Sequence, residues 1–85
     1  MKEIKYVITD PLGLHARPAG QLVKAASACA CDVKLLVKGA EADAKRIMGV
    51  MRLAAKKGDE LTLRCSGADE AEAASKLEAF LKANL

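Results

Sequence analysis

The sequence predicts an α+β fold, an open-faced β-sandwich in which a four-stranded antiparallel sheet carries three helices on one face. Two observations lead to this prediction. Four segments alternate between apolar and polar residues, as strands do when one face of a sheet is buried. One-sided burial is typical of antiparallel sheets with helices on a single face. The segments between the strands show helical spacing, so the predicted order of elements is βαββαβα.

The length and composition of the chain limit what this fold can do. Its 85 residues suit one domain with a modest core, so we expect residues 1–85 to fold as a single domain. Aromatic residues make up 2% of the chain, so the core must be aliphatic. The net charge of +3 is spread along the chain, and few aromatic side chains are present for bases to stack on. We therefore expect no binding to nucleic acid.

The first part of the chain is predicted to form a strand, a loop and a helix. In residues 2–9 every second residue shares one face, and the predicted inward positions are Ile4, Tyr6 and Ile8. Residues 10–13, DPLG, break the alternation and predict a loop. We expect a helix from about residue 16 to residue 28. Its apolar residues fall on one stripe at helical spacing, at Ala19, Leu22, Val23 and Ala26.

A hairpin and a short helix are predicted next. Residues 32–38 alternate, and their inward positions are Val33, Leu35 and Val37. Because glycine accepts a positive φ, the Lys38-Gly39 pair predicts a tight turn into a short polar strand at about residues 40–43. We expect the short helix at about residues 46–54, with Lys56-Lys57-Gly58 as its basic last turn and glycine stop.

The last part of the chain predicts a strand and a longer helix. The strand alternates, with inward positions at Leu61, Leu63 and Cys65. Asp69 is expected to cap the helix, since its carboxylate can accept hydrogen bonds from the free N–H groups of the first turn. Glu70 and Glu72 would lie at the positive end of the helix dipole and Lys82 near the negative end. The predicted core-facing positions are Ala74, Leu77 and Leu81.

The cysteines predict no chemistry of their own. Their odd number, three, and the lack of a secretory segment argue against a disulfide framework. Cys29 and Cys31 do not have the spacing of a CxxC motif or a zinc knuckle, and the chain has one histidine, so we expect no metal site and no cofactor. We interpret the cysteines as buried or half-buried small residues. No segment is long and apolar enough for a membrane span or a signal peptide, so we expect a cytoplasmic protein without membrane insertion.

Residues 13–20, GLHARPAG, place the only histidine at the predicted start of the first helix. His15 falls at the N-cap, where the N–H groups of Ala16 and Arg17 have no helical partner and the dipole is positive. Anions bind at such helix starts. The guanidinium of Arg17 matches the geometry of a phosphate, and Pro18 stiffens the first turn.

These residues predict a nucleophilic imidazole that receives and holds a dianion. A carboxylate or a free phosphate would also suit an anion site, but Ser, Thr or Gly would serve such a site without a histidine. No paired carboxylates, second histidine or obvious general base accompany His15, which argues against hydrolysis. A group carrier needs none of these, because its partners supply them. We therefore expect a covalent carrier and not an enzyme.

The stretch GLHARPA resembles the active-site signature of the HPr family, the histidine-containing phosphocarrier proteins of the bacterial phosphoenolpyruvate-dependent sugar phosphotransferase system. Residues 44–61, AKRIMGVMRLAAKKGDEL, resemble the second signature of this family, and the predicted order of elements is the HPr order. The resemblance extends over essentially the whole chain. It implies that Enzyme I passes a phosphoryl group to Nδ1 of His15, where Arg17 and the helix start hold it, and that the IIA domain of a sugar permease then receives it.

The resemblance also implies a partner surface on the first two helices. The implied contact positions are Leu14, Gly20, Gln21, Lys24, Ile47, Met48 and Met51. The flexible thioethers of the methionines suit a surface that binds several partners; the alternative is that they fill gaps in the core. Lys24 and Arg52 would steer acidic partners, an effect that weakens as salt rises. We expect the protein itself to be a monomer.

Arg46 departs from the family pattern. One branch of the family carries a regulatory serine immediately before the IMGVM run, and Arg46 cannot be phosphorylated by the same chemistry. Either this regulation is absent, which we favour, or Arg46 adds a permanent basic contact for partners. Two alternative functions also remain: a regulatory module of the same fold that acts by docking, and a carrier in a nitrogen-related or dihydroxyacetone kinase relay. His15 and Arg17 favour a carrier, because a docking module needs neither.

Overall fold

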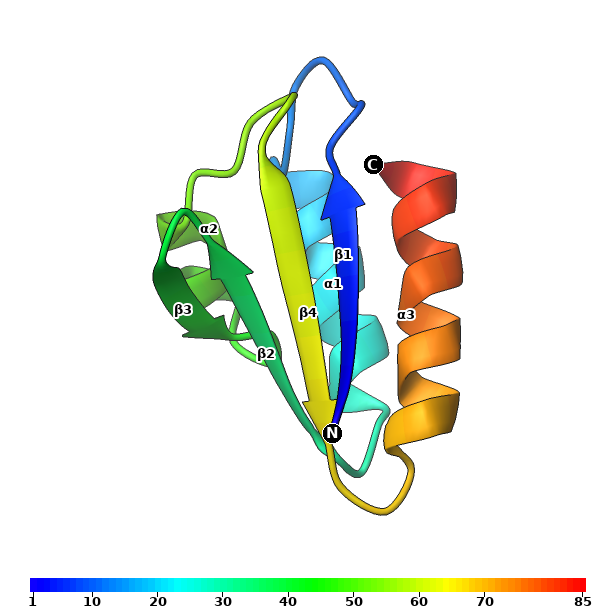
Figure 1. Ribbon diagram of the computed structural model, residues 1–85. Helices are drawn as coiled ribbons and strands as arrows, with labels where there is room; N and C mark the ends of the chain where they lie inside the picture. The colour runs from blue at the N-terminus through cyan, green and yellow to red at the C-terminus, as the bar shows by residue number, and fades with distance from the viewer.

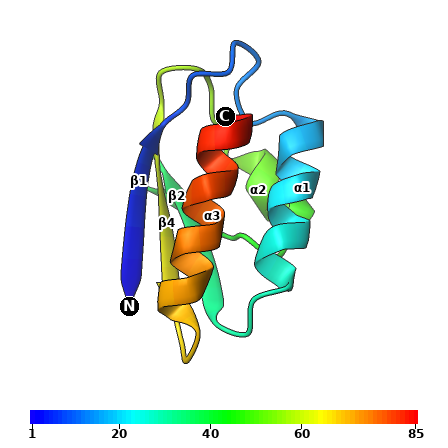
Figure 2. The ribbon, with the colours of Figure 1, turned by 90° about the vertical axis from the view of Figure 1, so that its right-hand side faces the viewer.

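The order of the strands along the sheet is β1-β4-β2-β3, and every neighbouring pair is antiparallel. The computed structural model describes residues 1–85. Its elements are β1 (Lys2–Val7), α1 (Ala16–Ser27), β2 (Asp32–Val37), β3 (Ala40–Asp43), α2 (Ile47–Arg52), β4 (Glu60–Ser66) and α3 (Glu70–Asn84). All three helices lie on one face of the sheet, and the other face is open (Figures 1 and 2). The predicted open-faced sandwich and its βαββαβα order are confirmed.

The register of the strands explains where the core forms. Leu63 of β4 lies between Ile4 of β1 and Leu35 of β2, and all three side chains are buried beneath the helices. Helices α1 and α3 close this layer with the buried residues Ala19, Leu22, Ala26, Ala73, Ala74, Leu77 and Leu81. Together with the loops, they form one core cluster of 21 buried residues. The alternation read from the sequence therefore identified the inward face of each long strand.

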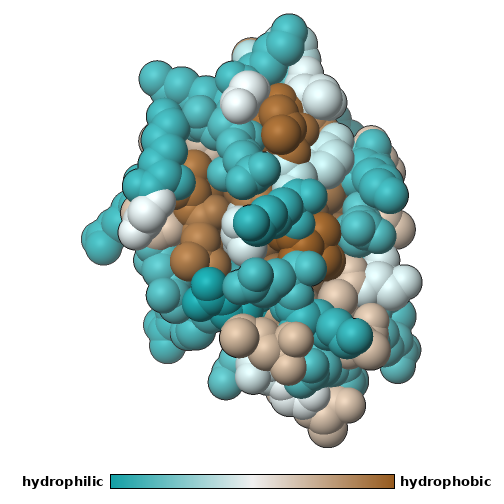
Figure 3. Space-filling model, in the orientation of Figure 1, coloured by the Kyte–Doolittle hydropathy of each residue, from teal (hydrophilic) through white to brown (hydrophobic).

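The open face of the sheet is largely hydrophilic, with a few hydrophobic patches (Figure 3). Its most direct polar contact joins two neighbouring strands. Arg64 lies opposite Glu3 in the register, and its Nε donates to Oε2 of Glu3 at 2.9 Å. This face carries the solvated half of the alternating pattern.

The hairpin between β2 and β3 has the predicted turn. Lys38 and Gly39 both have positive φ, 52° and 81°, as a two-residue turn of this kind requires. The ammonium group of Lys38 lies 3.4 Å from the carboxylate of Asp59, which links the hairpin to the segment that enters β4.

The prediction for the end of the short helix was wrong. Helix α2 ends at Arg52, and its last N–H groups bond three residues back, from Leu53 to Val50 and from Ala54 to Met51. Ala54 then takes a positive φ of 49°, which ends the helix well before the glycine that was expected to stop it. The Lys56-Lys57-Gly58 segment instead forms the turn before β4, where the N–H of Gly58 donates to the carbonyl of Ile8 at 2.8 Å.

The prediction that Asp69 caps the last helix with its side chain was also wrong. Asp69 is the N-cap residue of α3, as expected, and its carbonyl accepts the N–H of Ala73 at 2.9 Å, but its side chain makes no capping bond and its φ and ψ of −103° and 22° are not those of an extended cap. Its carboxylate accepts hydrogen bonds from the backbone N–H groups of Ala30 at 2.9 Å and Cys31 at 2.8 Å. These bonds lower the pKa of Asp69, chiefly through the N–H of Ala30. Asp69 thus fastens the start of α3 to the loop that enters β2.

The cysteines lie where the sequence indicated. Cys31 and Cys65 are buried, Cys29 is half-buried, and all three are free thiols. Burial raises the pKa of the Cys31 thiol to about 12, and the neighbouring Asp69 adds to this shift. The structure contains no helix with the length and apolar character that crossing a membrane requires.

Candidate functional site

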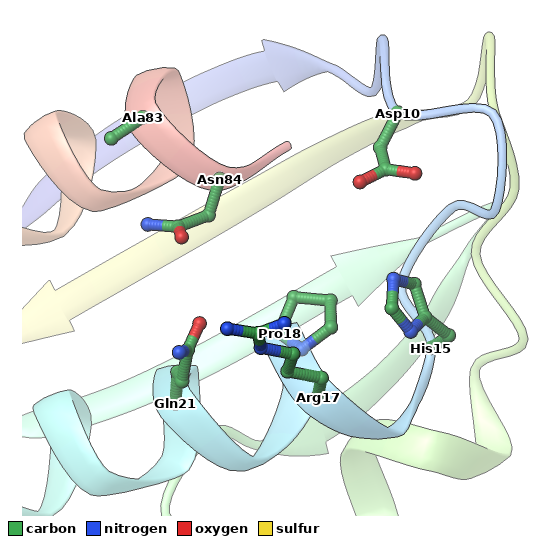
Figure 4. A pocket seen from close by; sticks show the side chains of 7 residues that line it. All are labelled: Asp10, His15, Arg17, Pro18, Gln21, Ala83 and Asn84. Atoms are coloured by element: carbon green, nitrogen blue, oxygen red, sulfur yellow. The ribbon is translucent and has the colours of Figure 1, made fainter.

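A polar hollow of about 260 Å³ lies where the start of α1 meets the end of α3. Figure 4 shows Arg17 and Gln21 reaching into it from α1, Asn84 facing them from α3, and His15 and Asp10 at the other end. The lining residues are Asp10, His15, Arg17, Pro18, Gln21, Ala83 and Asn84. The hollow therefore joins the GLHARPAG motif with residues from the far end of the chain.

His15 is the N-cap residue of α1, as predicted. Its backbone is extended, with φ −91° and ψ −178°, and its carbonyl accepts the N–H of Ala19 at 2.9 Å, which begins the helix. Its own N–H donates to the carbonyl of Gly13 at 3.0 Å. The imidazole makes no capping bond and is half-buried. The backbone of His15 is thus fixed at both of its polar groups, while the ring makes no hydrogen bond within the protein.

Gly13 holds the loop before His15 against the segment that follows α2. Its φ is +67°, and a Cβ built on it would lie 2.5 Å from the carbonyl oxygen of Ala55 and 2.8 Å from Cα of Lys56. Leu14 donates its N–H to the same carbonyl of Ala55 at 2.9 Å. A residue with a side chain at position 13 would force these two segments apart, and His15 would move with them.

A second set of bonds fixes the first part of this loop. Asp10 accepts the N–H of Leu12 on its Oδ1 at 2.8 Å and the N–H of Gly13 on its carbonyl at 2.9 Å. The N–H groups of Thr9 and Asp10 both donate to the carbonyl of Leu85, at 2.6 and 2.8 Å. The loop is therefore tied to the end of α3, which brings Ala83 and Asn84 to the rim of the hollow.

The start of α1 offers several hydrogen-bond donors without acceptors. The N–H groups of Ala16 and Arg17 have no partner in the protein, and Pro18 has no N–H. The first turn contains no acidic residue, and the exposed guanidinium of Arg17 forms no ion pair. These donors lie beside His15 at the positive end of the helix dipole. The arrangement suits an anion with several oxygens, such as a phosphoryl group.

The positions nominated for partner contact lie mainly on exposed parts of α1 and α2, which pack against each other. Gly20, Gln21 and Lys24 of α1 and Arg52 of α2 are all exposed. Ile47, Met48 and Met51 expose 40%, 68% and 37% of their surface. Val50 is the residue of α2 that fills the core, so Met48 and Met51 do not act as core fillers.

Leu14 differs from the other nominated positions. Its side chain is 5% exposed and belongs to the core cluster, so it offers almost no area to a partner. The reason is its place directly after Gly13, where the loop turns inward to meet Ala55. Its structural role is to anchor the loop that carries His15.

Sequence reasoning missed Asp10 and Asn84, which line the hollow with His15. Asp10 carried a signal, because it begins the DPLG loop and aspartate is common where a side chain accepts a bond from the backbone two residues on. Asn84 carried none, because it lies at the other end of the chain and reaches the hollow through the packing of α3. Its amide donates to the carbonyl of Phe80 at 3.0 Å.

Comparison with known proteins gives a consistent result. The family model described as the PTS HPr component phosphorylation site matches residues 2–83. The phosphocarrier protein HPr of Mycoplasma genitalium is 40% identical over 85 residues, which cover 99% of this chain and 97% of that protein. The crystal structure of HPr-C-His from Thermoanaerobacter tengcongensis has a TM-score of 0.92 at 35% identity, covering 98% of this chain and 93% of that chain. The Bacillus subtilis catabolite repression protein Crh, described as a swapped dimer, has a TM-score of 0.77 at 40% identity, covering 100% of this chain and 98% of that chain.

Proposed function

The chain belongs to the HPr family of phosphocarrier proteins, and from this premise we propose that His15 accepts a phosphoryl group from Enzyme I and passes it to the IIA domains of sugar permeases. Membership of the family supports a role as a phosphoryl carrier of the phosphotransferase system. The proposal adds the acceptor atom, the donor and the recipients.

The observation that carries the proposal is the position of the free His15 ring at the start of α1. The N–H groups of Ala16 and Arg17 have no other partner, and the guanidinium of Arg17 lines the same hollow. Donors fixed in this way stabilise the charge of a phosphoryl group without having to reorganise when it arrives. An anion site alone would not need an imidazole, whereas a covalent carrier does.

The transfer itself requires one nucleophile and no bound cofactor. The lone pair of Nδ1, the nitrogen that the family resemblance nominates, attacks the phosphorus atom and forms the P–N bond. The bond between phosphorus and the donor breaks, and its electron pair leaves with the donor. Arg17 neutralises part of the negative charge on the transferred group. The second transfer repeats these steps with His15 as the leaving group.

A carrier must also release its phosphoryl group readily. The hollow is open, and the carboxylate of Asp10 lines it opposite the donors of α1. The negative charge of Asp10 opposes that of the bound group and prevents the site from holding it too tightly. The combination of donors and one opposing carboxylate favours transient binding over storage.

A regulatory docking role is the second candidate, because Crh is named for catabolite repression and is 40% identical to this chain. A docking protein would need neither His15 nor the donors around it, so the site favours the carrier. A nitrogen-related or dihydroxyacetone kinase relay would use the same chemistry with other recipients. In each of these relays we expect the protein to work in the cytoplasm and as a monomer.

The proposal is tested by a chase of labelled phosphoryl groups. The protein is incubated with Enzyme I and phosphoenolpyruvate carrying labelled phosphorus, separated from both, and mixed with a purified IIA domain. We expect the label to enter the wild-type protein, to be missing from His15→Ala, and to move to the IIA domain within one mixing step. A charged protein that cannot pass its label to any sugar-specific IIA domain would contradict the sugar relay.

A further inference from the structure

The three thiols of the chain lie close together beyond the C-terminal end of α1, whereas His15 lies at the start of that helix (Figure 1). Cys29 follows α1, Cys31 precedes β2, and Cys65 lies near the end of β4. We call these three residues the thiol cluster. No three ligating side chains in the structure are placed to hold a metal ion, so the thiol cluster is not a metal site.

Two members of the thiol cluster lie on the covered face of the sheet. Cys65 pairs with Val33, and Cys31 lies two residues before Val33, so both side chains point to the helical side. Cys31 is 3% exposed and Cys65 is fully buried. A Cβ built on Gly67 would lie 2.7 Å from the Cβ of Cys31, which places Cys31 against the turn that follows β4.

Cys29 differs from the other two because solvent reaches it. Its side chain is half-buried against the core, and its Sγ donates to the carbonyl of Ala25 at 3.5 Å. The ammonium group of Lys45 donates to the carbonyl of Cys29 at 2.9 Å. A second ammonium group is near, because Glu72 raises the pKa of Lys76 most and Cys29 adds to this effect. A half-exposed thiol beside cations has the surroundings typical of reactive cysteines.

Cys65 is a better partner for Cys29 than Cys31 is. Burial raises the pKa of the Cys65 thiol most, and Cys29 is the next largest cause, so these two thiols are near each other. Cys31 is separated from Cys29 by one residue, and a disulfide between cysteines so close in the chain has a strained geometry. The Cys31 thiol also faces the carboxylate of Asp69, which adds to the effect of burial and raises its pKa to about 12.

We propose that Cys29 is a modification site that reacts with peroxides, and that Cys65 converts the product into an intramolecular disulfide. In the first step the sulfur of Cys29 attacks a peroxide oxygen, the O–O bond breaks, and water or an alcohol leaves, so Cys29 becomes a sulfenic acid. In the second step the sulfur of Cys65 attacks the sulfur of Cys29. The S–O bond breaks, and the hydroxide leaves as water with the thiol proton. The two thiols thereby lose two electrons, which reduce one molecule of peroxide.

The modification goes beyond the proposed function and does not depend on it, because no cysteine lines the hollow around His15. It is also reversible. A thiol reductant attacks the disulfide and restores both cysteines. The sequence indicated no role for the cysteines beyond packing, because Cys65 reaches the other two only through the pairing of β4 with β2.

The test counts the free thiols of the reduced protein after treatment with hydrogen peroxide. The remaining thiols are blocked with a maleimide in denaturant, and the intact mass gives their number. We expect this number to fall from three to one in the wild-type protein. A tryptic map without reductant should then link residues 25–34 to residues 65–76. Because residues 25–34 contain both Cys29 and Cys31, variants are needed to assign the link.

Three variants make this assignment, each checked for its fold by circular dichroism. Cys31→Ala is the matched control and should still form the link, whereas Cys29→Ser should not. In Cys65→Ala the reaction should stop at the sulfenic acid of Cys29, which dimedone traps. A link that persists in Cys29→Ser, or is lost in folded Cys31→Ala, would overturn the inference. So would three free thiols in the wild-type protein under a treatment that oxidises glutathione, and neither outcome bears on the charging of His15.

Discussion

Replacing Gly13 by alanine tests how the loop before His15 is held. Two costs add at this position. A residue with a Cβ pays about 1–2 kcal/mol for the left-handed backbone, here with φ +67°. The new Cβ would also lie 2.5 Å from the carbonyl oxygen of Ala55, and forcing extra atoms into a packed contact costs about 1–3 kcal/mol. We therefore expect a loss of about 2–5 kcal/mol in the free energy of unfolding.

This loss is large for a chain of 85 residues. Domains of this size have a free energy of unfolding of about 4–13 kcal/mol, and each kcal/mol shifts Tm by roughly 4–8 °C. Thermal unfolding followed by far-UV circular dichroism should show Tm falling by roughly 10–40 °C. Because Gly13 positions the backbone of His15, the rate of phosphorylation by Enzyme I should also fall at temperatures where the variant is still folded.

Two other glycines provide matched controls. Gly39 has φ +81° but no atom within 4 Å of a built Cβ, so Gly39→Ala pays only for the backbone, about 1–2 kcal/mol. Gly20 lies within α1 with no atom within 4 Å, and Gly20→Ala should raise stability by about 0.5–1 kcal/mol. From highest to lowest, the expected order of Tm is Gly20→Ala, wild type, Gly39→Ala and then Gly13→Ala. Equal Tm values for the Gly39 and Gly13 variants would refute the argument from close packing.

Three further predictions follow from the electrostatics. Because the pKa of Asp69 is lowered in the folded protein, the unfolded chain takes up this proton more readily. The Asp69 carboxylate therefore contributes to the free energy of unfolding above its ordinary pKa of 3.8, and this contribution is lost as the pH falls below that value. Asp69→Asn should be less stable at neutral pH and lose less stability on acidification, and parallel Tm curves against pH would contradict this. Iodoacetamide should modify half-buried Cys29 well before Cys31, because burial raises the pKa of the Cys31 thiol to about 12; equal labelling in peptide mass maps would rule this out. Asp10→Asn keeps an oxygen for the N–H of Leu12 but removes the negative charge that lines the hollow. The equilibrium of phosphoryl exchange with Enzyme I should therefore shift about two- to fivefold towards the phosphorylated protein. An unchanged equilibrium would show that Asp10 does not act on the phosphoryl group.

Much of the fold could be predicted from local patterns in the sequence. The alternation around Ile4, Leu35 and Leu63 identifies the buried face of each long strand. Successive residues of a strand point to opposite faces of the sheet, so once helices cover one face, every second residue is buried. The start of α1 at His15 could also be predicted, because a proline in the first turn and an apolar stripe both indicate the same helix boundary.

The errors arose where distant segments decide the outcome. Asp69 is an ordinary capping residue in the sequence, but the loop at Ala30 and Cys31 presents two N–H groups to the same carboxylate. The end of α2 is a different, local case: Ala54 takes a positive φ, which alanine rarely adopts, so no signal in the sequence indicated that the helix ends there. Asn84 enters the hollow only because α3 packs alongside the start of α1. Contacts of this kind depend on the assembled fold, so neither the residue type nor its neighbours in the sequence predict them.

The most direct test of the central claim is the intact mass of the protein after incubation with Enzyme I and phosphoenolpyruvate, measured beside His15→Ala. The account predicts a gain of one phosphoryl group in the wild-type protein, lost on brief exposure to acid, and no gain in a folded His15→Ala variant. An unchanged wild-type mass, obtained with an Enzyme I preparation that charges another HPr, would contradict the claim. A phosphoryl group that remains on His15→Ala would contradict it equally.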